Sequence, residues 1–154
     1  MKNSIEKNLD SMGFSLPKKI KVAGSYIPFI YEGKFLFISG QLPVKNNKVI
    51  FSGKISNKNK DYGYKAAQLC GVNILGLINA ATKGNFNKIK RCIRINGFVN
   101  CEKNFTEHPF IINGTSDLIM KIFKKKGQHT RTAIGVSSLP LNASIEIDAI
   151  FLTN

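Results

Sequence analysis

The chain lacks the features that mark membrane and secreted proteins. Its longest apolar runs, such as the FLFI of residues 35–38, fall far short of the roughly 20 residues that a membrane helix needs. The first 14 residues mix charged and apolar side chains, so they do not form the continuous apolar stretch of a secretory signal. We therefore expect a cytoplasmic protein with no membrane partner.

Cysteine and histidine are scarce, and their spacing forms no metal or redox motif. The three cysteines, Cys70, Cys92 and Cys101, are an odd number without a CxxC pair, so we expect buried free thiols. The two histidines, His108 and His129, lack HExxH-like spacing. We predict that the protein binds no metal.

Several catalytic motifs are also missing. The sequence contains no GxSxG elbow, no Walker A loop and no GxGxxG after a strand. Their absence argues against the enzyme classes that depend on them. A nucleophilic pair of one cysteine and one histidine stays open, although no local signature supports one.

Acidic residues are few, and the excess of basic ones leaves two interpretations. Nine Asp and Glu stand against 23 Lys and Arg, which gives a formal net charge of +14. Such a charge creates a positive field that attracts nucleic acid or small anions. The alternative is compositional drift, because the lysines are spread along the chain and the longest basic run is only residues 124–126.

The 154 residues fit one domain, and residues 1–25 form an amino-terminal extension to it. Hydrophobic periodicity predicts three helices: Ile5–Met12, a long helix from an N-cap at Asp61 to Thr82, and a third over Ile111–Phe123. The expected strands are Lys34–Ser39 and Val49–Phe51, paired as a hairpin, then Ile89–Val99, Arg131–Ser138 and Ser144–Leu152.

This order of elements predicts an α+β fold, in which a single mixed sheet carries both long helices on one face. In the strand over Ile89–Val99, alternation places Ile89, Ile93, Ile95 and Val99 on the same side. The face of the sheet away from the helices would be a large apolar patch in water, and self-association is the simplest way to cover it.

Arg131 is the first candidate for chemistry. Strand parity places it on one face with Ala133, Gly135 and Ser137, and these small residues leave open volume beside it. A guanidinium at the edge of such a space is suited to a carboxylate or a phosphate. The alternative is an edge arginine paired with Asp or Glu.

Glu146 and Asp148 are the second candidate. Parity puts both acids on one face of the last strand, opposite the apolar Ile145, Ile147 and Ala149. Two acids in a strand otherwise this apolar point to a site, whereas the simpler interpretation is a solvated face.

A resemblance joins these candidates. SGQLP at 39–43, Asn113, HTRTAIGVSSLP at 129–140 and SIEIDAI at 144–150 resemble, in order and spacing, the successive signatures of the RidA/YjgF family. The resemblance covers the chain from Tyr26 onward. It implies a Bacillus chorismate mutase-like fold and a homotrimer with ligand clefts between its subunits.

The resemblance also implies an activity and its residues. Members of this family hydrolyse reactive 2-imino acids, formed from enamines, to 2-oxo acids and ammonia without a cofactor. Arg131 matches the arginine that grips the substrate carboxylate, and Glu146 matches the acid that manages the proton of the attacking water. The residues that match the lining of the same cleft are Tyr26, Ser39, Gly40 and Asn113.

The chain departs from the best-studied deaminases around its arginine. Gln128, His129 and Thr130 stand where a proline and an alanine commonly precede the arginine, and Ala133 replaces a frequent cysteine. These differences indicate a divergent branch. His129 either adds a titratable group near the cleft or only shapes the loop.

Two other functions stay open. The first is RNA binding or cleavage, which some family members are described with and which draws on the net charge and on four basic residues, Lys88, Lys90, Arg91 and Arg94. The second is a non-catalytic regulator that binds a small carboxylate or a partner protein through the same cleft.

Overall fold

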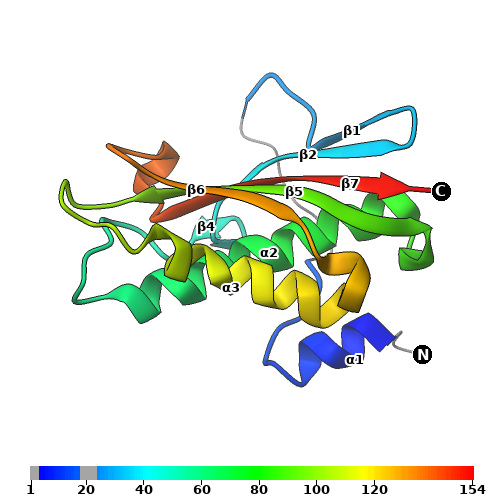
Figure 1. Ribbon diagram of the computed structural model, residues 1–154, viewed down its shortest axis with the longest axis horizontal. Helices are drawn as coiled ribbons and strands as arrows, with labels where there is room; N and C mark the ends of the chain where they lie inside the picture. Colours follow the sequence, from blue (N-terminus) through cyan, green and yellow to red (C-terminus); the bar gives the residue numbers. More distant parts are fainter. Residues whose placement is uncertain (1–3, 18–23) are drawn as a thin grey trace.

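The computed structural model describes residues 4–17 and 24–154, and its centre is a five-stranded sheet (Figure 1). The strands lie in the order β1-β2-β7-β5-β6. Their bounds are Phe29–Glu32 (β1), Phe35–Gln41 (β2), Ile89–Asn100 (β5), Thr130–Val136 (β6) and Ile145–Thr153 (β7). Only β5 and β6 pair in parallel, so the predicted mixed sheet is confirmed.

Two long helices, α2 (Lys60–Thr82) and α3 (His108–Phe123), pack on the same face of the sheet, as predicted (Figure 1). The stripe of α2 begins with Ala67, Cys70 and Ile74, all fully buried. In α3, Ile111 is fully buried and so is Thr115, whose hydroxyl donates to a carbonyl of α2. The 3.6-residue period of these apolar positions is what makes both segments helical and turns them toward the sheet.

The predicted N-cap at Asp61 was two residues late. The helix begins at Lys60, and Asn59 occupies the N-cap position. The Asn59 side chain accepts a hydrogen bond from the Ser56 amide at 2.7 Å and so closes the preceding turn. Asp61 therefore lies in the first turn, where its charge favours the helix amino terminus.

The predicted hairpin between Lys34–Ser39 and Val49–Phe51 was wrong. The first of these strands, β2, pairs with β1 on one side and β7 on the other. The asparagines of the KNN turn, Asn46 and Asn47, adopt positive φ, but the turn joins two shorter strands, β3 (Val44–Lys45) and β4 (Lys48–Val49). A two-residue turn of this kind fixes only its nearest neighbours, so it closes a separate small ribbon.

The predicted facing of Ile93 was also wrong. The ladder between β5 and β7 is irregular between Ile89 and Arg91 and again between Cys92 and Arg94. Each irregularity changes the parity of the following residues. Cys92 is fully buried as a result, while Ile93 is only partly buried.

The two faces of the sheet differ in what covers them. On the helix side, Leu36, Ile38 and Phe151 are almost completely buried. On the outer side, β1, β2 and β6 expose large apolar side chains, with exposed fractions of 52% for Ile30, 42% for Phe35, 39% for Phe37 and 44% for Ile134. An apolar face of this size is typical of an interface.

The amino-terminal segment adds a short helix, α1 (Ser4–Asp10), beneath the helix layer (Figure 1). It buries Leu9 completely, and the chain turns at Gly13, whose φ is +76°. Part of the expected extension, residues 1–3 and 18–23, lies outside the described residues. In the described part of the chain, no helix is long and apolar enough to cross a membrane.

Candidate functional site

The structure divides the six predicted site residues between the two faces of the sheet. Ile95 pairs with Arg131 on one side and with Ala149 on the other, so Arg131 points toward the helices. Glu146 pairs with Phe98, which lies three residues after Ile95 in β5 and so faces the other side of the sheet. Glu146 therefore points outward. Asn113 joins Arg131 on the helix side, whereas Glu146 shares an outer cleft with Tyr26, Ser39 and Gly40.

We call the helix-side part the arginine half; its members come from β6 and from the first three turns of α3. Arg131 Nη1 donates to Asn113 Oδ1 at 2.8 Å and to Ser116 Oγ at 3.0 Å. Its Nη2 donates to the Pro109 carbonyl oxygen at 3.4 Å. Asn113 and Ser116 lie three residues apart, so one face of the helix presents both acceptors to the guanidinium.

These three bonds leave one edge of the Arg131 guanidinium open. A guanidinium carries five hydrogens in a fixed plane, and both hydrogens of Nη1 are used. Within residues 4–17 and 24–154, Nε makes no hydrogen bond and Nη2 makes one, so each of these two nitrogens keeps a free N–H. That edge has the geometry for a carboxylate held by two hydrogen bonds.

His129 belongs to the same network. Its Nδ1 lies 2.6 Å from the Gly127 carbonyl oxygen, and its Nε2 lies 2.9 Å from Ser116 Oγ. Burial lowers the pKa of His129; the hydrogen bond to the Gly127 carbonyl opposes that shift, and the neighbouring Arg131 charge adds to it. The ring is therefore neutral at neutral pH.

The open volume expected beside Arg131 is largely filled, which corrects the prediction. Ala133 packs against the core, and a Cβ on Gly135 would lie 2.6 Å from His108 Nε2 and 2.7 Å from Cys101 Sγ. The small residues of β6 therefore serve close packing by α3 and the loop before it.

We call the outer part the glutamate half. It is a cleft of about 930 Å³ between the 26–30 segment, β2, β7 and the 140–141 turn. Most of its lining is apolar, contributed by residues such as Ile27, Phe37, Leu42 and Leu141, and Glu146 and Asp148 supply the acids. Leu141 is 72% exposed and has a positive φ of 55°, an unusual conformation for a leucine.

The Glu146 carboxylate fits because Gly40 has no side chain. A Cβ on Gly40 would collide with Glu146 Oε1. The β2–β7 ladder shifts its register between Ile38 and Gln41, which places Ser39 and Gly40 in a bulge beside β7. Gln41 is buried and donates to the carbonyl oxygens of Ser39 and Gly40 at 2.9 and 3.1 Å, so it holds the bulge in place.

Ser39 holds the neighbouring wall of the cleft. Its hydroxyl donates to the Ile27 carbonyl oxygen at 2.7 Å, and its amide donates to the Pro28 carbonyl oxygen at 3.0 Å. Tyr26 is 50% exposed at the edge of the cleft. The structure thus gives Ser39 a role in shaping the cleft, with its lone pairs left as acceptors.

The two acids of this half have different surroundings. Burial raises the pKa of Glu146, and the neighbouring Asp148 charge raises it further. Burial also raises the pKa of Asp148, but a 2.7 Å hydrogen bond from Asn96 and the Arg94 charge oppose that shift. Asp148 therefore has partners for its negative charge, and Glu146 is the acid better suited to exchange a proton.

A cysteine and a histidine do meet, although no sequence signature indicated it. Cys101 Sγ lies 3.5 Å from His108 Nε2, at the end of β5 and the start of α3. Burial raises the pKa of the Cys101 thiol, partly offset by the Lys54 charge, so the thiol is not activated as a thiolate. All three cysteines are free; Cys70 and Cys92 are buried as predicted, and Cys101 is partly buried.

Sequence reasoning missed Ser116 and Gln41 as functional positions. Ser116 had a usable signal, because a polar residue three positions after Asn113 interrupts an apolar helix. Gln41 had none, since the bulge that it holds appears only once β2 and β7 pair. Within the described residues, no group of three or more His, Cys, Asp or Glu side chains could hold a metal ion.

Comparisons with known proteins identify the family of the chain. Residues 6–152 match the family model described as "YjgF/chorismate mutase-like, putative endoribonuclease". Protein TCP17 of Trypanosoma cruzi is 34% identical over 152 residues, 97% of this chain and 94% of that protein. A 2-iminobutanoate/2-iminopropanoate deaminase of Dermatophagoides farinae is 26% identical over 138 residues, 88% of this chain and 91% of that enzyme.

A solved structure gives the same result for the fold. The crystal structure of the protein Atu1372 from Agrobacterium tumefaciens superposes with a TM-score of 0.91 at 42% identity, over 97% of this chain and 92% of that one. The match therefore includes the strands that carry Arg131 and Glu146. The chain belongs to the RidA/YjgF family and has its chorismate mutase-like α+β fold.

Proposed function

We propose that the protein hydrolyses reactive 2-imino acids to 2-oxo acids and ammonia, at clefts between the subunits of a homotrimer. One observation carries the proposal: Arg131 and Glu146 lie on opposite faces of the same sheet. A single chain cannot present both to one small substrate. Two copies can, if the arginine half of one subunit borders the glutamate half of the next.

The exposed apolar face supports the trimer. The outer strands expose Ile30, Phe35, Phe37 and Ile134, and association would remove these side chains from water. An arrangement in which each subunit offers a different edge to its neighbour closes into a ring when the rotation allows. Leu141, at the rim of the glutamate half, would lie at such a border.

The reaction needs few groups. The open Nε and Nη2 edge of Arg131 binds the substrate carboxylate, which places the imine carbon at the border between the halves. Glu146, as the carboxylate, takes a proton from water while the water oxygen bonds to the imine carbon. The imine nitrogen takes up a solvent proton in this step, which gives a neutral tetrahedral amino alcohol. Glu146 then returns its proton to that nitrogen, and the C–N bond breaks as the hydroxyl oxygen forms the C=O bond and releases its proton to solvent, so that ammonia and the 2-oxo acid leave. General base help of this kind is worth roughly a hundredfold to ten-thousandfold.

The experiment uses two inactive variants that repair each other. Arg131→Ala and Glu146→Gln should each reduce imine hydrolysis by about 100-fold or more, because each removes one half of every site. Co-expressed with separate tags and purified as mixed trimers, they should regain about a third of the parent activity, since one of the three borders in every mixed trimer joins two intact halves. Imines are generated by an amino-acid oxidase, and ammonia is measured.

The matched control pairs Arg131→Ala with a chain that carries both substitutions, because no border in that mixture has an intact arginine half. Restored activity in the test mixture alone supports the proposal. A mixture no more active than its components, or a fully active monomer, contradicts it.

RNA binding is the second candidate, and one observation favours it. Lys88, Lys90, Arg91 and Arg94 are all exposed along the start of β5, and the family description names an endoribonuclease. Arg94, however, already donates to Asn96 and Thr132 at 2.8 Å each. Titration with labelled single-stranded RNA should show binding that weakens steeply with salt if these residues neutralise phosphates.

A further inference from the structure

A chain of hydrogen bonds connects the backbone at Gly127 to the guanidinium of Arg131. It runs from the Gly127 carbonyl to His129, from His129 Nε2 to Ser116, and from Ser116 Oγ to Arg131 Nη1, with lengths of 2.6, 2.9 and 3.0 Å. Ser116 is 4% exposed, so its hydroxyl depends on protein partners.

The donors and acceptors leave only one direction for this chain. A carbonyl oxygen only accepts, so the hydrogen of the neutral His129 ring is on Nδ1. Nε2 is then the acceptor, and it takes the hydroxyl hydrogen of Ser116. Ser116 Oγ is left with its lone pairs toward Arg131, which only donates.

His129 therefore decides how Ser116 meets Arg131. A serine hydroxyl rotates freely and can turn its hydrogen toward a cation, which repels it. With that hydrogen held by Nε2, the oxygen stays an acceptor for Nη1, and the second Nη1 hydrogen stays on Asn113. The two bonds of Nη1 then restrict rotation of the guanidinium plane, and they leave Nε and Nη2 directed toward the ligand.

We infer that His129 is a positioning residue that acts through Ser116 to hold the Arg131 guanidinium with its Nε and Nη2 edge toward a carboxylate ligand. The inference rests on the proposed function for the class of ligand, whereas the hydrogen-bond chain stands on the geometry alone. It assigns His129 no contact with the substrate.

Nitrogen NMR on the full-length protein tests the chain directly. The His129 ring should be the neutral form with hydrogen on Nδ1, and Ser116→Ala should shift its Nε2 resonance. The Arg131 Nε–H signal should move or broaden in His129→Phe and in Ser116→Ala, but not in Gln128→Ala, a matched control at the exposed neighbouring side chain. A His129 ring hydrogen on Nε2, or an Arg131 Nε–H signal that is unchanged in His129→Phe, would overturn the inference.

Titration with 2-oxobutanoate, followed on the same Arg131 signal, measures the consequence. His129→Phe should weaken binding about three- to tenfold, the usual effect of one lost hydrogen bond. Ser116→Ala should weaken it equally, and the double variant should be no weaker, because both act on one chain. His129→Gln, whose amide oxygen can replace Nε2 as acceptor, should restore binding.

The outcomes separate this inference from the proposed function. No binding of 2-oxobutanoate to the parent protein, additive losses in the double variant, or losses equal to that of Gln128→Ala would overturn the positioning role. Intact binding with the expected pattern of losses supports it, even where imine turnover is absent. Absent turnover would overturn only the deaminase proposal.

Discussion

The arginine half and the glutamate half are built on different physical principles. Arg131 is fixed by direct hydrogen bonds to Asn113, Ser116 and Pro109, and its position is over-determined. Glu146 is placed by shape: the carboxylate lies against the bare backbone of Gly40, in a bulge held by Gln41. One half depends on polar partners, and the other on the absence of a side chain.

This difference suits the two charges. A guanidinium keeps its charge under all ordinary conditions, so hydrogen bonds can hold it without changing its chemistry. Donors placed around Glu146 would stabilise its ionised form and lower its pKa. Burial without strong donors leaves the pKa of Glu146 raised, which is useful in a group that takes and returns a proton.

The largest effect on the glutamate half is expected from adding a methyl group to Gly40. In Gly40→Ala the new Cβ would displace the Glu146 carboxylate, and activity should fall about 100-fold, as expected for a catalytic group moved by about an ångström. Stability should change by less than about 1 kcal/mol, because the displaced atoms are the end of a flexible side chain. Activity and thermal melting together check this.

A double-variant cycle gives the control for that prediction. If Gly40→Ala acts only through Glu146, it should cause no further loss in a Glu146→Gln background. A further large loss there would mean that Gly40 contacts the substrate directly.

The pH dependence of the reaction tests whether burial and the Asp148 charge raise the pKa of Glu146. Glu146 must be ionised to act as a base, and burial together with Asp148 raises its pKa, so the acid limb of kcat/KM should lie above the range of an ordinary glutamate. Asp148→Asn removes a like charge and lowers that pKa, although burial remains. The limb should therefore move to lower pH, measured from rates across the acid range.

Asp148→Glu serves as the control because it keeps the charge, and the limb should stay near its original position. A limb that moves equally in both variants would show that packing at residue 148, and not its charge, sets the pKa of Glu146.

The helix layer could be predicted from the sequence because its signal is local. The apolar stripes of α2 and α3 repeat at helical spacing, and nothing in the tertiary structure opposes them. The strand β1 (FIYE) was missed because three of its four residues are exposed and their polarity does not alternate. The wrong hairpin has a similar cause, since the KNN turn specifies a turn but not which strands adjoin it.

The placement of the two halves was harder to predict. In β7, alternation identified the inward face, because Glu146 and Asp148 are the polar residues. In β6, both faces are apolar or small: Ile134 points outward although it is large, and Ala133 inward although it is small. Alternation along β6 therefore assigns its residues to two faces but does not indicate which face the helices cover. The position of Arg131 beside α3 could be found only from the structure.

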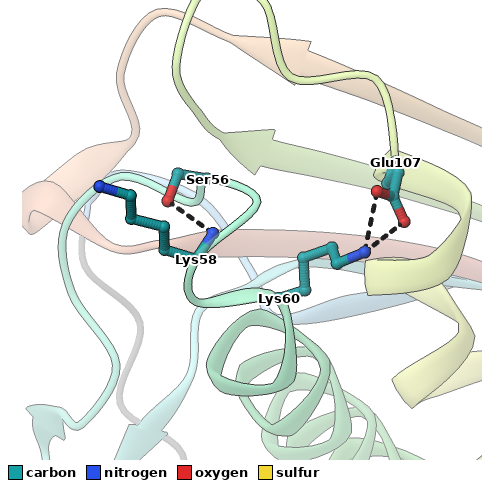
Figure 2. A network of polar contacts seen from close by, with 4 residues as sticks. All are labelled: Ser56, Lys58, Lys60 and Glu107. Atoms are coloured by element: carbon teal, nitrogen blue, oxygen red, sulfur yellow. Dashed lines mark hydrogen bonds and ion pairs between the residues drawn. The ribbon is translucent and has the colours of Figure 1, made fainter.

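The smallest expected effect concerns how firmly the arginine half is anchored. Lys60 Nζ of α2 lies 2.8 Å from both carboxylate oxygens of Glu107 (Figure 2). Glu107 immediately precedes α3, whose first turn contains Pro109, and the Pro109 carbonyl accepts a hydrogen bond from Arg131. The pair is partly exposed, so Glu107→Gln should cost only about 0.2 to 1 kcal/mol of folding free energy. Denaturant unfolding measures that loss.

Lys58→Ala is the matched control. Its backbone amide donates to Ser56 Oγ, and its exposed side chain makes no hydrogen bond to any residue that the structure describes, so it can be removed without breaking a contact (Figure 2). Because the ion pair tethers α3 and not β2 or β7, Glu107→Gln should raise KM slightly and leave the acid limb of the pH profile unchanged. A shift of that limb would mean that the two halves are coupled through the helix layer, against the separation that their different construction implies.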